Sequence, residues 1–252
     1  MKRRRTLYLD DARHYYLYVF EPPMTMAEAW LPVDQVSGTS VNTFVNGVSA
    51  GGLFYPTKVG KQFGEMLRES SGPRSSGFAR RPFDGIAQWR AWSNMRGLMQ
   101  QGLDPLKVLV DRAHEKDMEF IASLRMGTLE PTSPAHMSST GGRMLAHPEV
   151  RDLLFSITQE LVSDYDVEGV ELDFSAPAAS WDLFRQEEAR DNIPLLTELV
   201  GKISSMVRSG QEGRRTVGAK VFPTEEMNLD RGLDVRTWLS QGLLDFVVPS
   251  VF

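Results

Sequence analysis

The chain has 252 residues, of which 41% are hydrophobic and 24% are charged, and its formal net charge at pH 7 is −5. This length suits a single α/β barrel, and the composition is that of a globular protein rather than a disordered chain. The acidic balance argues against the basic footprint of a nucleic-acid-binding protein, and the absence of cysteine excludes disulfides, zinc–thiolate sites and cysteine nucleophiles.

The amino end carries a basic run at residues 2–5, which we interpret as a solvated tail. The apolar segment of a signal peptide does not follow, because Asp10, Asp11, Arg13 and His14 interrupt the sequence. No stretch approaches the length of a transmembrane helix. We therefore expect neither a membrane nor a nucleic-acid partner, and a cytoplasmic location by default, or export if the natural N-terminus lies upstream. The oligomeric state is left open.

Short apolar segments alternate with amphipathic ones, which predicts parallel strands joined by helical crossovers. The first strand is expected at residues 15–20, with residues 6–9 as the alternative, and the second at residues 41–48. Residues 51–84, rich in Gly, Ser, Pro and Arg, are expected to form a long loop.

Helix signals follow in the middle of the chain. A helix is expected over residues 89–101. Asp104 then caps a second helix, with Pro105 at its first position. A strand at residues 118–126 and a loop at residues 127–146 complete this part.

The second half repeats the alternation until the chain ends in a strand. The expected elements are a helix opened by Pro148, a strand at 169–174, a helix capped by Asn192, a strand at 216–222, a helix capped by Asp234 and a strand at 245–251. We predict an α/β fold, a (β/α)8 TIM-type barrel that is incomplete, with about six βα units present and the last two missing. The domain prediction is one barrel over residues 1–252, truncated at its C-terminal end. The alternative is a six-stranded sheet whose edge a partner chain covers.

The fourth expected strand carries two acids, although strands of parallel sheets are normally apolar on both faces. Because side chains alternate, Val170, Leu172 and Phe174 are expected to face the helices. Glu171 and Asp173 then point into the barrel, with Cα atoms about 6.6–7 Å apart. Barrels accept buried carboxylates mainly at the carboxyl ends of strands, where active sites lie. We predict both acids as catalytic residues: Asp173 acts on the substrate, and Glu171, one level deeper, tunes it or holds substrate hydroxyls.

Counter-charges are expected on the neighbouring strands. Arg125 near the end of the third strand and Lys220 on the fifth lie on the faces that would point inward. If both do, they flank the two acids. The alternative is purely structural: a buried ion pair of Glu171 with Lys220 or with Arg125.

Several segments resemble, in order, the glycosyl-hydrolase-like family ten of bacterial TIM-barrel proteins. They are residues 34–41, 147–151, 169–174 and 232–235, continuing to Trp238, 242–245 and 248–250. The resemblance implies a sugar-processing barrel with its site at the carboxyl ends of the strands. In similar retaining glycosidases the fourth strand carries the acid/base, which corresponds to Asp173, and the nucleophile lies on the seventh strand, absent here. The sequence departs from the family pattern at residues 127–128 and 175–180, both at the expected site.

Glycosidic cleavage normally uses two carboxyl groups that flank the bond, one of them protonated near neutral pH. Glu171 and Asp173 could be this pair, but carboxyl groups from different strands flank a sugar better. The alternatives for the partner of Asp173 are Glu225, Glu226, Asp10 and Asp11.

Sugar rings stack on aromatic side chains, so Tyr55 and Trp181, both in expected loops, are candidates for substrate contact. The substrate-binding candidates together are Arg125, Lys220, Asn46, Asp11, Tyr55, Trp181 and Glu225. The four histidines, His14, His114, His136 and His147, lack metal-site spacing, and no metal or cofactor is expected.

The leading hypothesis is a glycoside hydrolase, or a fragment of one, acting on a bacterial or plant glycan. One alternative is a catalytically inactive carbohydrate-binding or structural barrel, favoured by the departures after Asp173. A weaker alternative is a metal-dependent hydrolase that uses Asp10, Asp173 and a distant histidine.

Overall fold

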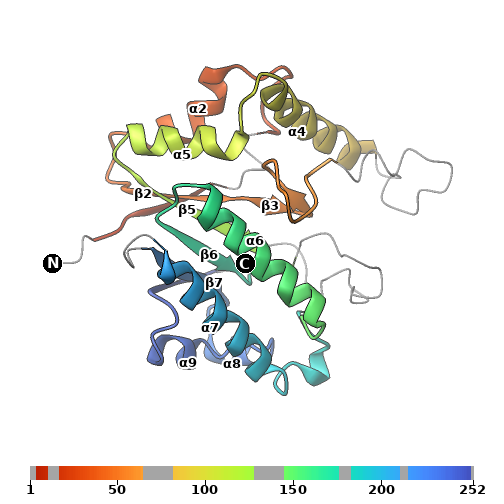
Figure 1. Ribbon diagram of the computed structural model, residues 1–252, viewed down its shortest axis with the longest axis vertical. Helices are drawn as coiled ribbons and strands as arrows, with labels where there is room; N and C mark the ends of the chain where they lie inside the picture. The colour runs from red at the N-terminus through yellow and green to blue at the C-terminus, as the bar shows by residue number, and fades with distance from the viewer. Residues whose placement is uncertain are drawn as a thin grey trace. The chain divides into compact units, whose positions relative to one another are not determined.

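The computed structural model describes residues 4–10, 17–64, 82–127, 145–175, 183–210 and 215–250 (Figure 1). The chain divides into two compact units, Met1–Phe120 and Ile121–Phe252. The prediction of a single domain over residues 1–252 stays a prediction.

The described residues of the first unit form a parallel strand pair, three helices and a small hairpin. Its elements are β1 (Leu7–Asp10), α2 (Met26–Asp34), β2 (Thr43–Gly47), β3 (Ser49–Ala50), β4 (Gly52–Leu53), α4 (Pro82–Gln100) and α5 (Pro105–Glu115). Strands β1 and β2 pair in parallel, whereas β3 and β4 form an antiparallel hairpin. Strand β5 (Glu119–Arg125) begins in this unit and continues into the second.

The preferred position for the first strand is wrong, and the alternative near residues 6–9 is right. Among residues 15–20, only 17–20 are described, and they form bends. The carbonyls of Leu17 and Phe20 accept hydrogen bonds from Asn94 Nδ2 on α4, at 3.3 and 2.8 Å. A side-chain amide therefore satisfies backbone groups that a strand would have paired with a neighbouring strand.

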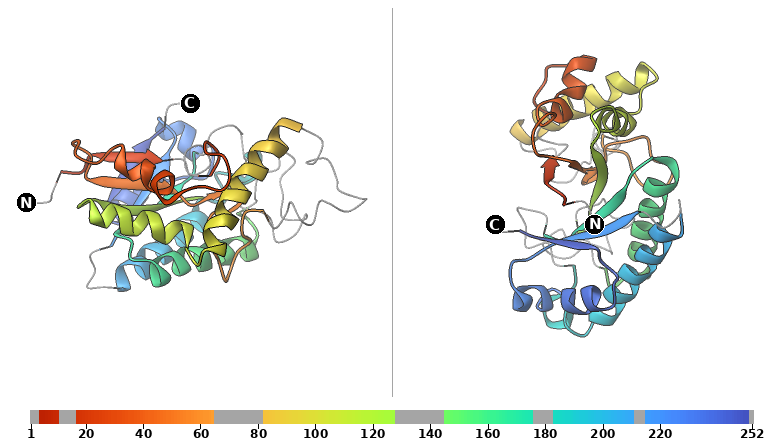
Figure 2. Two further views of the ribbon diagram at one scale, coloured as in Figure 1. Left: turned by 90° about the horizontal axis from the view of Figure 1, so that it is seen from above. Right: turned by 90° about the vertical axis from the view of Figure 1, so that its left-hand side faces the viewer.

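The second unit repeats strand and helix in sequence order. Its elements are the rest of β5, α6 (Pro148–Asp164), β6 (Gly169–Asp173), the 3-10 turn η3 (Gln186–Glu188), α7 (Ile193–Ser209), β7 (Thr216–Val221), α8 (Glu225–Leu229), α9 (Val235–Ser240) and β8 (Phe246–Pro249). Strands β5 to β8 pair in parallel, each with the next. Helices α6 and α7 lie side by side along one face of these strands (Figures 1 and 2).

Caps and apolar spacing explain why these helices form. Asp104 accepts hydrogen bonds from the backbone N–H groups of Leu106 (2.9 Å) and Lys107 (3.2 Å) at the start of α5. Asp234 accepts one from Thr237 (3.0 Å) at the start of α9. Helix α7 buries the residues that recur at helical spacing, namely Leu196, Leu199, Val200, Ile203 and Val207. Burying each such side chain stabilises the fold by roughly 1.5–3 kcal/mol.

Four short elements and one helix were not expected from the sequence. The hairpin β3–β4 lies in the expected loop of residues 51–84 and just before it, and η3 and α8 are also new. Helix α2 had a readable signal: Thr25 and Glu28 form a capping box, in which each side chain bonds the backbone N–H of the other residue. Residues 65–81 and 128–144 of the expected loops lie outside the described residues.

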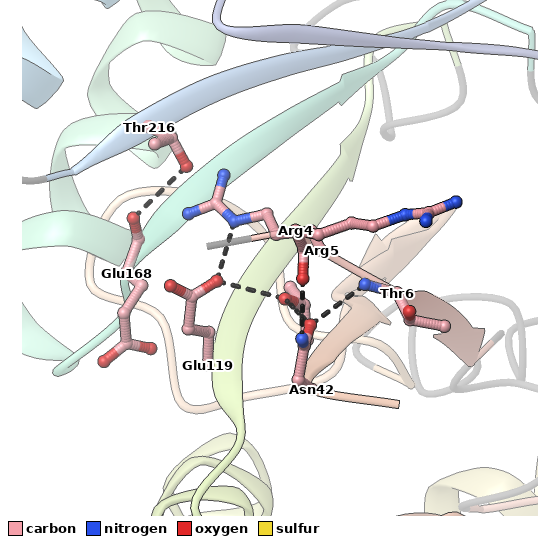
Figure 3. Close-up of polar contacts among 8 residues, drawn as sticks. Arg4, Arg5, Thr6, Asn42, Glu119, Glu168 and Thr216 are labelled. Carbon is pink, nitrogen blue, oxygen red and sulfur yellow. Dashed lines mark hydrogen bonds and ion pairs between the residues drawn. The ribbon is translucent and has the colours of Figure 1, made fainter. Parts of the chain in front are cut away.

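The amino ends of the strands are fixed by polar contacts (Figure 3). In the first unit, Glu119 accepts hydrogen bonds from Arg5 Nε at 2.7 Å and from Thr43 Oγ1 at 3.0 Å. Asn42 accepts from the Thr6 N–H at 2.9 Å. In the second unit, the Thr216 N–H donates to the Glu168 carbonyl at 2.9 Å. These contacts fix the starts of β1, β2, β5 and β7, and they pair the carboxylate of Glu119 with Arg5.

Six strands of the described residues, β1, β2 and β5 to β8, are parallel. A complete barrel of this type has eight, each followed by a helix. The α/β class is confirmed, with fewer strands than a complete barrel needs.

Candidate active site

Strand β6 positions the two acids of the candidate site. Phe174, just after the strand, packs on Trp238 of α9, with ring centroids 5.5 Å apart. Because side chains alternate along a strand, Glu171 and Asp173 point to the opposite face. Both are almost fully buried, with 2% and 4% of their surfaces exposed. The predicted division between a helix-facing side and an acidic side therefore agrees with the packing.

Asp173 lies at the end of β6 between two cations. It is level with Arg125 on β5 and with Lys220 on β7. Its Oδ2 is 4.0 Å from Arg125 Nε and 3.8 Å from Lys220 Nζ. Charge-assisted hydrogen bonds are normally about 2.7–2.9 Å, so these are ion pairs without a short hydrogen bond. Its Oδ1 accepts the backbone N–H of Ser175 at 3.0 Å.

The protonation of Asp173 reflects opposed effects. Burial raises the pKa of its carboxyl above the ordinary value. The positive charges of Lys220 and Arg125 and the hydrogen bonds from Ser175 lower it, but burial is the largest cause. The net direction is upward, so this carboxyl holds its proton at a higher pH than an exposed aspartate does.

Glu171 lies one level deeper, beside Ser123 of β5. The Ser123 hydroxyl donates a hydrogen bond to Glu171 Oε1 at 2.8 Å. Burial raises the pKa of Glu171 to about 7, and the charge of Asp173 adds to this, while Ser123 and Lys220 oppose it. Glu171 is thus close to half protonated at neutral pH. A carboxyl that exchanges protons near neutral pH is suited to acid–base chemistry.

The two cations, Arg125 and Lys220, do not pair with the acid that the structural alternative predicted. That alternative paired Glu171 with Lys220 or Arg125. The ion pairs within 4.0 Å join both cations to Asp173 instead. Glu171 receives its hydrogen bond from a neutral hydroxyl. The structure therefore brings four predicted residues, Glu171, Asp173, Arg125 and Lys220, into one cluster within the second unit.

The first unit holds other predicted residues. Asn46 on β2 is level with Asp10 on β1, and both are buried, with 2% and 1% exposed. Among the described residues, Asn46 Oδ1 has no hydrogen-bond partner. Tyr55 is fully buried, so its ring offers no exposed face for stacking on a sugar. Asp11 and Trp181 lie outside the described residues.

The acids after β7 are exposed and engaged in ion pairs. Glu225, at the start of α8, makes two hydrogen bonds of 2.6 Å with Arg236. Glu226 bonds Arg190 at 2.6 Å. Neither belongs to the cluster around Asp173 in the contacts of the described residues.

Two serines of the cluster were not predicted as site residues. Ser123 lies on the same face of β5 as Arg125, two residues before it, so strand alternation alone could have identified it. Ser175 follows Asp173 by two residues, the spacing at which an aspartate side chain commonly bonds the backbone. Ser175 occupies one of the positions where the sequence departs from the family pattern.

The described part of the chain contains no group of three or more His, Cys, Asp or Glu residues that could hold a metal ion. In the same residues, no helix has both the length and the apolar character needed to cross a membrane.

Several solved glycosidase structures share the fold. The chain matches the GH20 catalytic modules of the pneumococcal exo-β-D-N-acetylglucosaminidase StrH with a TM-score of 0.54 and 13% identity, over 96% of this chain and 64% of that one. It matches α-L-fucosidase isoenzyme 2 from Paenibacillus thiaminolyticus with a TM-score of 0.52 and 12% identity, over 90% and 34%. The GH36 α-galactosidase AgaA from Geobacillus stearothermophilus gives 0.52 and 11%, over 99% and 31%. At these identities the likeness concerns the fold, and it confirms the incomplete barrel.

Curated relatives are similar in sequence. Glycosyl hydrolase DigH of Escherichia coli K12 is 24% identical in an alignment that covers 67% of this chain and 52% of DigH. DigH of Shigella flexneri gives the same identity and coverage. The chain spans about half the length of the curated relatives it matches.

A protein-family model also matches the chain. The match runs from residue 83 to residue 252 and so includes all four residues of the acidic cluster. This agrees with the resemblance seen in the sequence motifs. The chain belongs to the glycosyl hydrolase-like 10 family.

Proposed function

We propose that this chain is the barrel portion of a glycoside hydrolase and that Asp173 exchanges a proton with the glycosidic oxygen. The observation that carries the proposal is the pair of buried acids on β6, where Glu171 has a pKa of about 7 and Asp173 lies between two cations. The relatives named glycosyl hydrolase support the reaction class.

Hydrolysis of a glycoside needs a proton at the departing oxygen while the bond to the anomeric carbon breaks. Water adds to that carbon and gives up a proton to a carboxylate. Asp173 is the acid nearer the strand end, where substrate is bound in barrels of this kind. Its raised pKa favours the protonated form that must supply the proton.

Glu171 supports Asp173 from the deeper level. In its neutral form it carries a proton that can be donated to Asp173 or to a substrate hydroxyl. In its ionised form it places a second negative charge beside Asp173, which is unfavourable in a buried site. Catalysis should therefore use the state with Glu171 protonated, and activity should fall as pH rises through about 7.

The substrate-binding residues are proposals of the same kind. Arg125 and Lys220 carry hydrogen-bond donors beside Asp173 and suit the hydroxyl oxygens of a sugar. In the first unit, Asn46 Oδ1 is a buried acceptor that a hydroxyl could satisfy, since no partner for it is found among the described residues.

A panel of aryl-glycosides and polysaccharides tests the proposal on the full-length protein and on Asp173→Asn. The matched control is Glu198→Gln, an exposed acid on α7 that pairs with Lys202. The proposal expects turnover of at least one substrate by the wild type and by the control, and its loss in Asp173→Asn. Turnover by Asp173→Asn at the wild-type rate would refute the role of Asp173.

The second candidate function is carbohydrate binding without catalysis. It is favoured by Ser175, which departs from the family pattern and occupies Asp173 Oδ1 through its backbone N–H. Binding of a polysaccharide by both the wild type and Asp173→Asn, without turnover by either, would support it.

A further inference from the structure

The ring of Phe246 lies directly over Gly218. Gly218 is level with Glu171 on one side and with Phe246 of β8 on the other. A Cβ atom added to Gly218 would lie 2.1 Å from Phe246 Cζ and 2.3 and 2.6 Å from its Cε atoms. The end of the ring thus fills the space that a side chain on β7 would occupy. Glycine within a strand often marks such a close approach.

The direction of the ring follows from this contact. Neighbouring parallel strands are about 4.8 Å apart, and residues at the same level point to the same face. A ring that starts on β8 and ends over Gly218 of β7 extends toward β6. At that level, β6 carries Glu171.

The start of β8 is itself fixed in register. Asp245 Oδ2 accepts the Val217 N–H at 2.8 Å and bonds Arg208 of α7 at 3.0 Å. These bonds attach the residue before Phe246 to β7 and to α7. The ring is therefore held over Gly218 by the backbone and by its neighbour, Asp245.

The polar and charged groups that face Glu171 in the described residues come from three strands, and Ile121 of β5, one level deeper, adds a buried apolar side chain on the same face. Strand β5 presents Ser123 and Arg125, strand β6 presents Asp173, and strand β7 presents Lys220. Ser123 and Lys220 favour the ionised form of Glu171, and Asp173 opposes it. On β8, Val248 is level with Lys220 rather than with Glu171. Among the described residues level with Glu171, which are Ser123, Gly218 and Phe246, only Phe246 has a large apolar side chain.

We propose that Phe246 is a positioning residue whose ring, seated over Gly218, covers Glu171 and keeps this acid in its neutral, proton-carrying form. Burial is the largest cause of the raised pKa of Glu171, and the ring supplies apolar surface on the side where Gly218 leaves room. The catalytic meaning of this role rests on the proposed function, but the effect on Glu171 does not.

The test is a titration of the Glu171 side-chain carboxyl by NMR in the full chain, labelled at glutamate carboxyl carbons. The wild type should titrate with a midpoint near 7. Phe246→Ala admits water to Glu171, and the midpoint should fall by about one unit or more. Phe246→Leu keeps part of the apolar cover, so the midpoint should fall less in this variant. Val248→Ala, one level away on the same strand, is the matched control and should leave the midpoint unchanged.

An unchanged midpoint in folded Phe246→Ala would overturn the proposal, as would an equal fall in Val248→Ala. If Phe246→Ala does not fold, Phe246→Leu decides, because its midpoint must still lie below that of the wild type. The two proposals fail separately. If the titration midpoint of Glu171 changes in the Phe246 variants but the protein has no glycosidase activity, only the proposed enzyme function is refuted. If the protein is active but the midpoint is the same in the Phe246 variants and the wild type, only the proposed role of the ring is refuted.

Discussion

Two acidic sites in this protein pair with cations in different ways. Glu119, at the amino end of β5, accepts short hydrogen bonds from Arg5 (2.7 Å) and Thr43 (3.0 Å), and 29% of its side chain is exposed. Asp173, at the carboxyl end of β6, has only 5% of its side chain exposed. Its Oδ2 lies 3.8 Å from Lys220 Nζ and 4.0 Å from Arg125 Nε. The first arrangement is a partly solvated structural contact. The second keeps a buried charge near donors that do not bond it closely, which is costly for folding and useful for chemistry.

The largest expected difference between the two acidic sites is in the effect of their substitutions on activity. Asp173→Asn keeps the shape of the side chain but removes the exchangeable proton, so we expect kcat/KM on a responsive glycoside to fall by about 100-fold or more. Glu119→Gln, made in the same background, should retain turnover because this acid serves the fold. Steady-state kinetics with both variants, and circular dichroism to show that both fold, measure the difference. Equal losses in the two variants would erase the distinction between the two sites.

The next largest expected effect is on the pH dependence of the free energy of unfolding. Burial raises the folded-state pKa of Glu171 from 4.5 to about 7, so the folded protein binds this proton more tightly than the unfolded chain does. The resulting stability is complete below pH 4.5 and is lost as pH rises through about 7. Relative to Glu171→Gln, the wild type should lose roughly 3 kcal/mol of unfolding free energy over this window. Urea unfolding of both proteins from pH 4 to 8 measures it, and a constant difference would contradict the raised pKa.

Removing a cation gives a smaller effect. Lys220 lowers the pKa of Asp173, so Lys220→Met should raise that pKa further. Because Asp173 must be protonated to act, kcat/KM of Lys220→Met should stay high to a higher pH than that of the wild type, so the alkaline limb of the pH–rate profile should move upward. The wild-type profile is the reference, and a limb that moves downward would assign it to another group.

The smallest expected effect concerns the amino end. Glu119→Gln loses a charge-assisted contact with Arg5 that is partly solvated, and such pairs contribute about 0–1 kcal/mol. Thermal unfolding should show a shift of only a few degrees. A loss comparable to that at a fully buried ion pair would mean that the amino end is more tightly coupled to the fold than its exposure indicates.

Much of the fold was readable from the sequence because its signals are local. Asp104 and Asp234 stand at their helix starts as expected, and the apolar spacing of α7 matches its buried face. The first strand was misplaced because residues 17–20 are apolar enough for a strand, yet Asn94, distant in sequence, bonds their carbonyls. A contact between residues so far apart in the chain cannot be recognised from the local sequence.

The acidic cluster was predictable for a similar reason. Glu171 and Asp173 break an apolar strand, and alternation places Arg125 and Lys220 at matching levels on the neighbouring strands. What the sequence could not show was the division of roles, with both cations nearest to Asp173 and Glu171 on Ser123. That division depends on the side-chain distances of 2.8, 3.8 and 4.0 Å, and sequence periodicity does not encode differences of this size.

The central claim is that a proton held near neutral pH by the β6 acids performs glycosidic cleavage, and the pH–rate profile of Glu171→Gln tests it most directly. The wild type should lose kcat/KM as pH rises through about 7. In Glu171→Gln, whose amide remains neutral, the alkaline limb should no longer lie at this pH, because it then reports Asp173 alone, while turnover at lower pH persists. An identical alkaline limb in the two proteins would contradict the account.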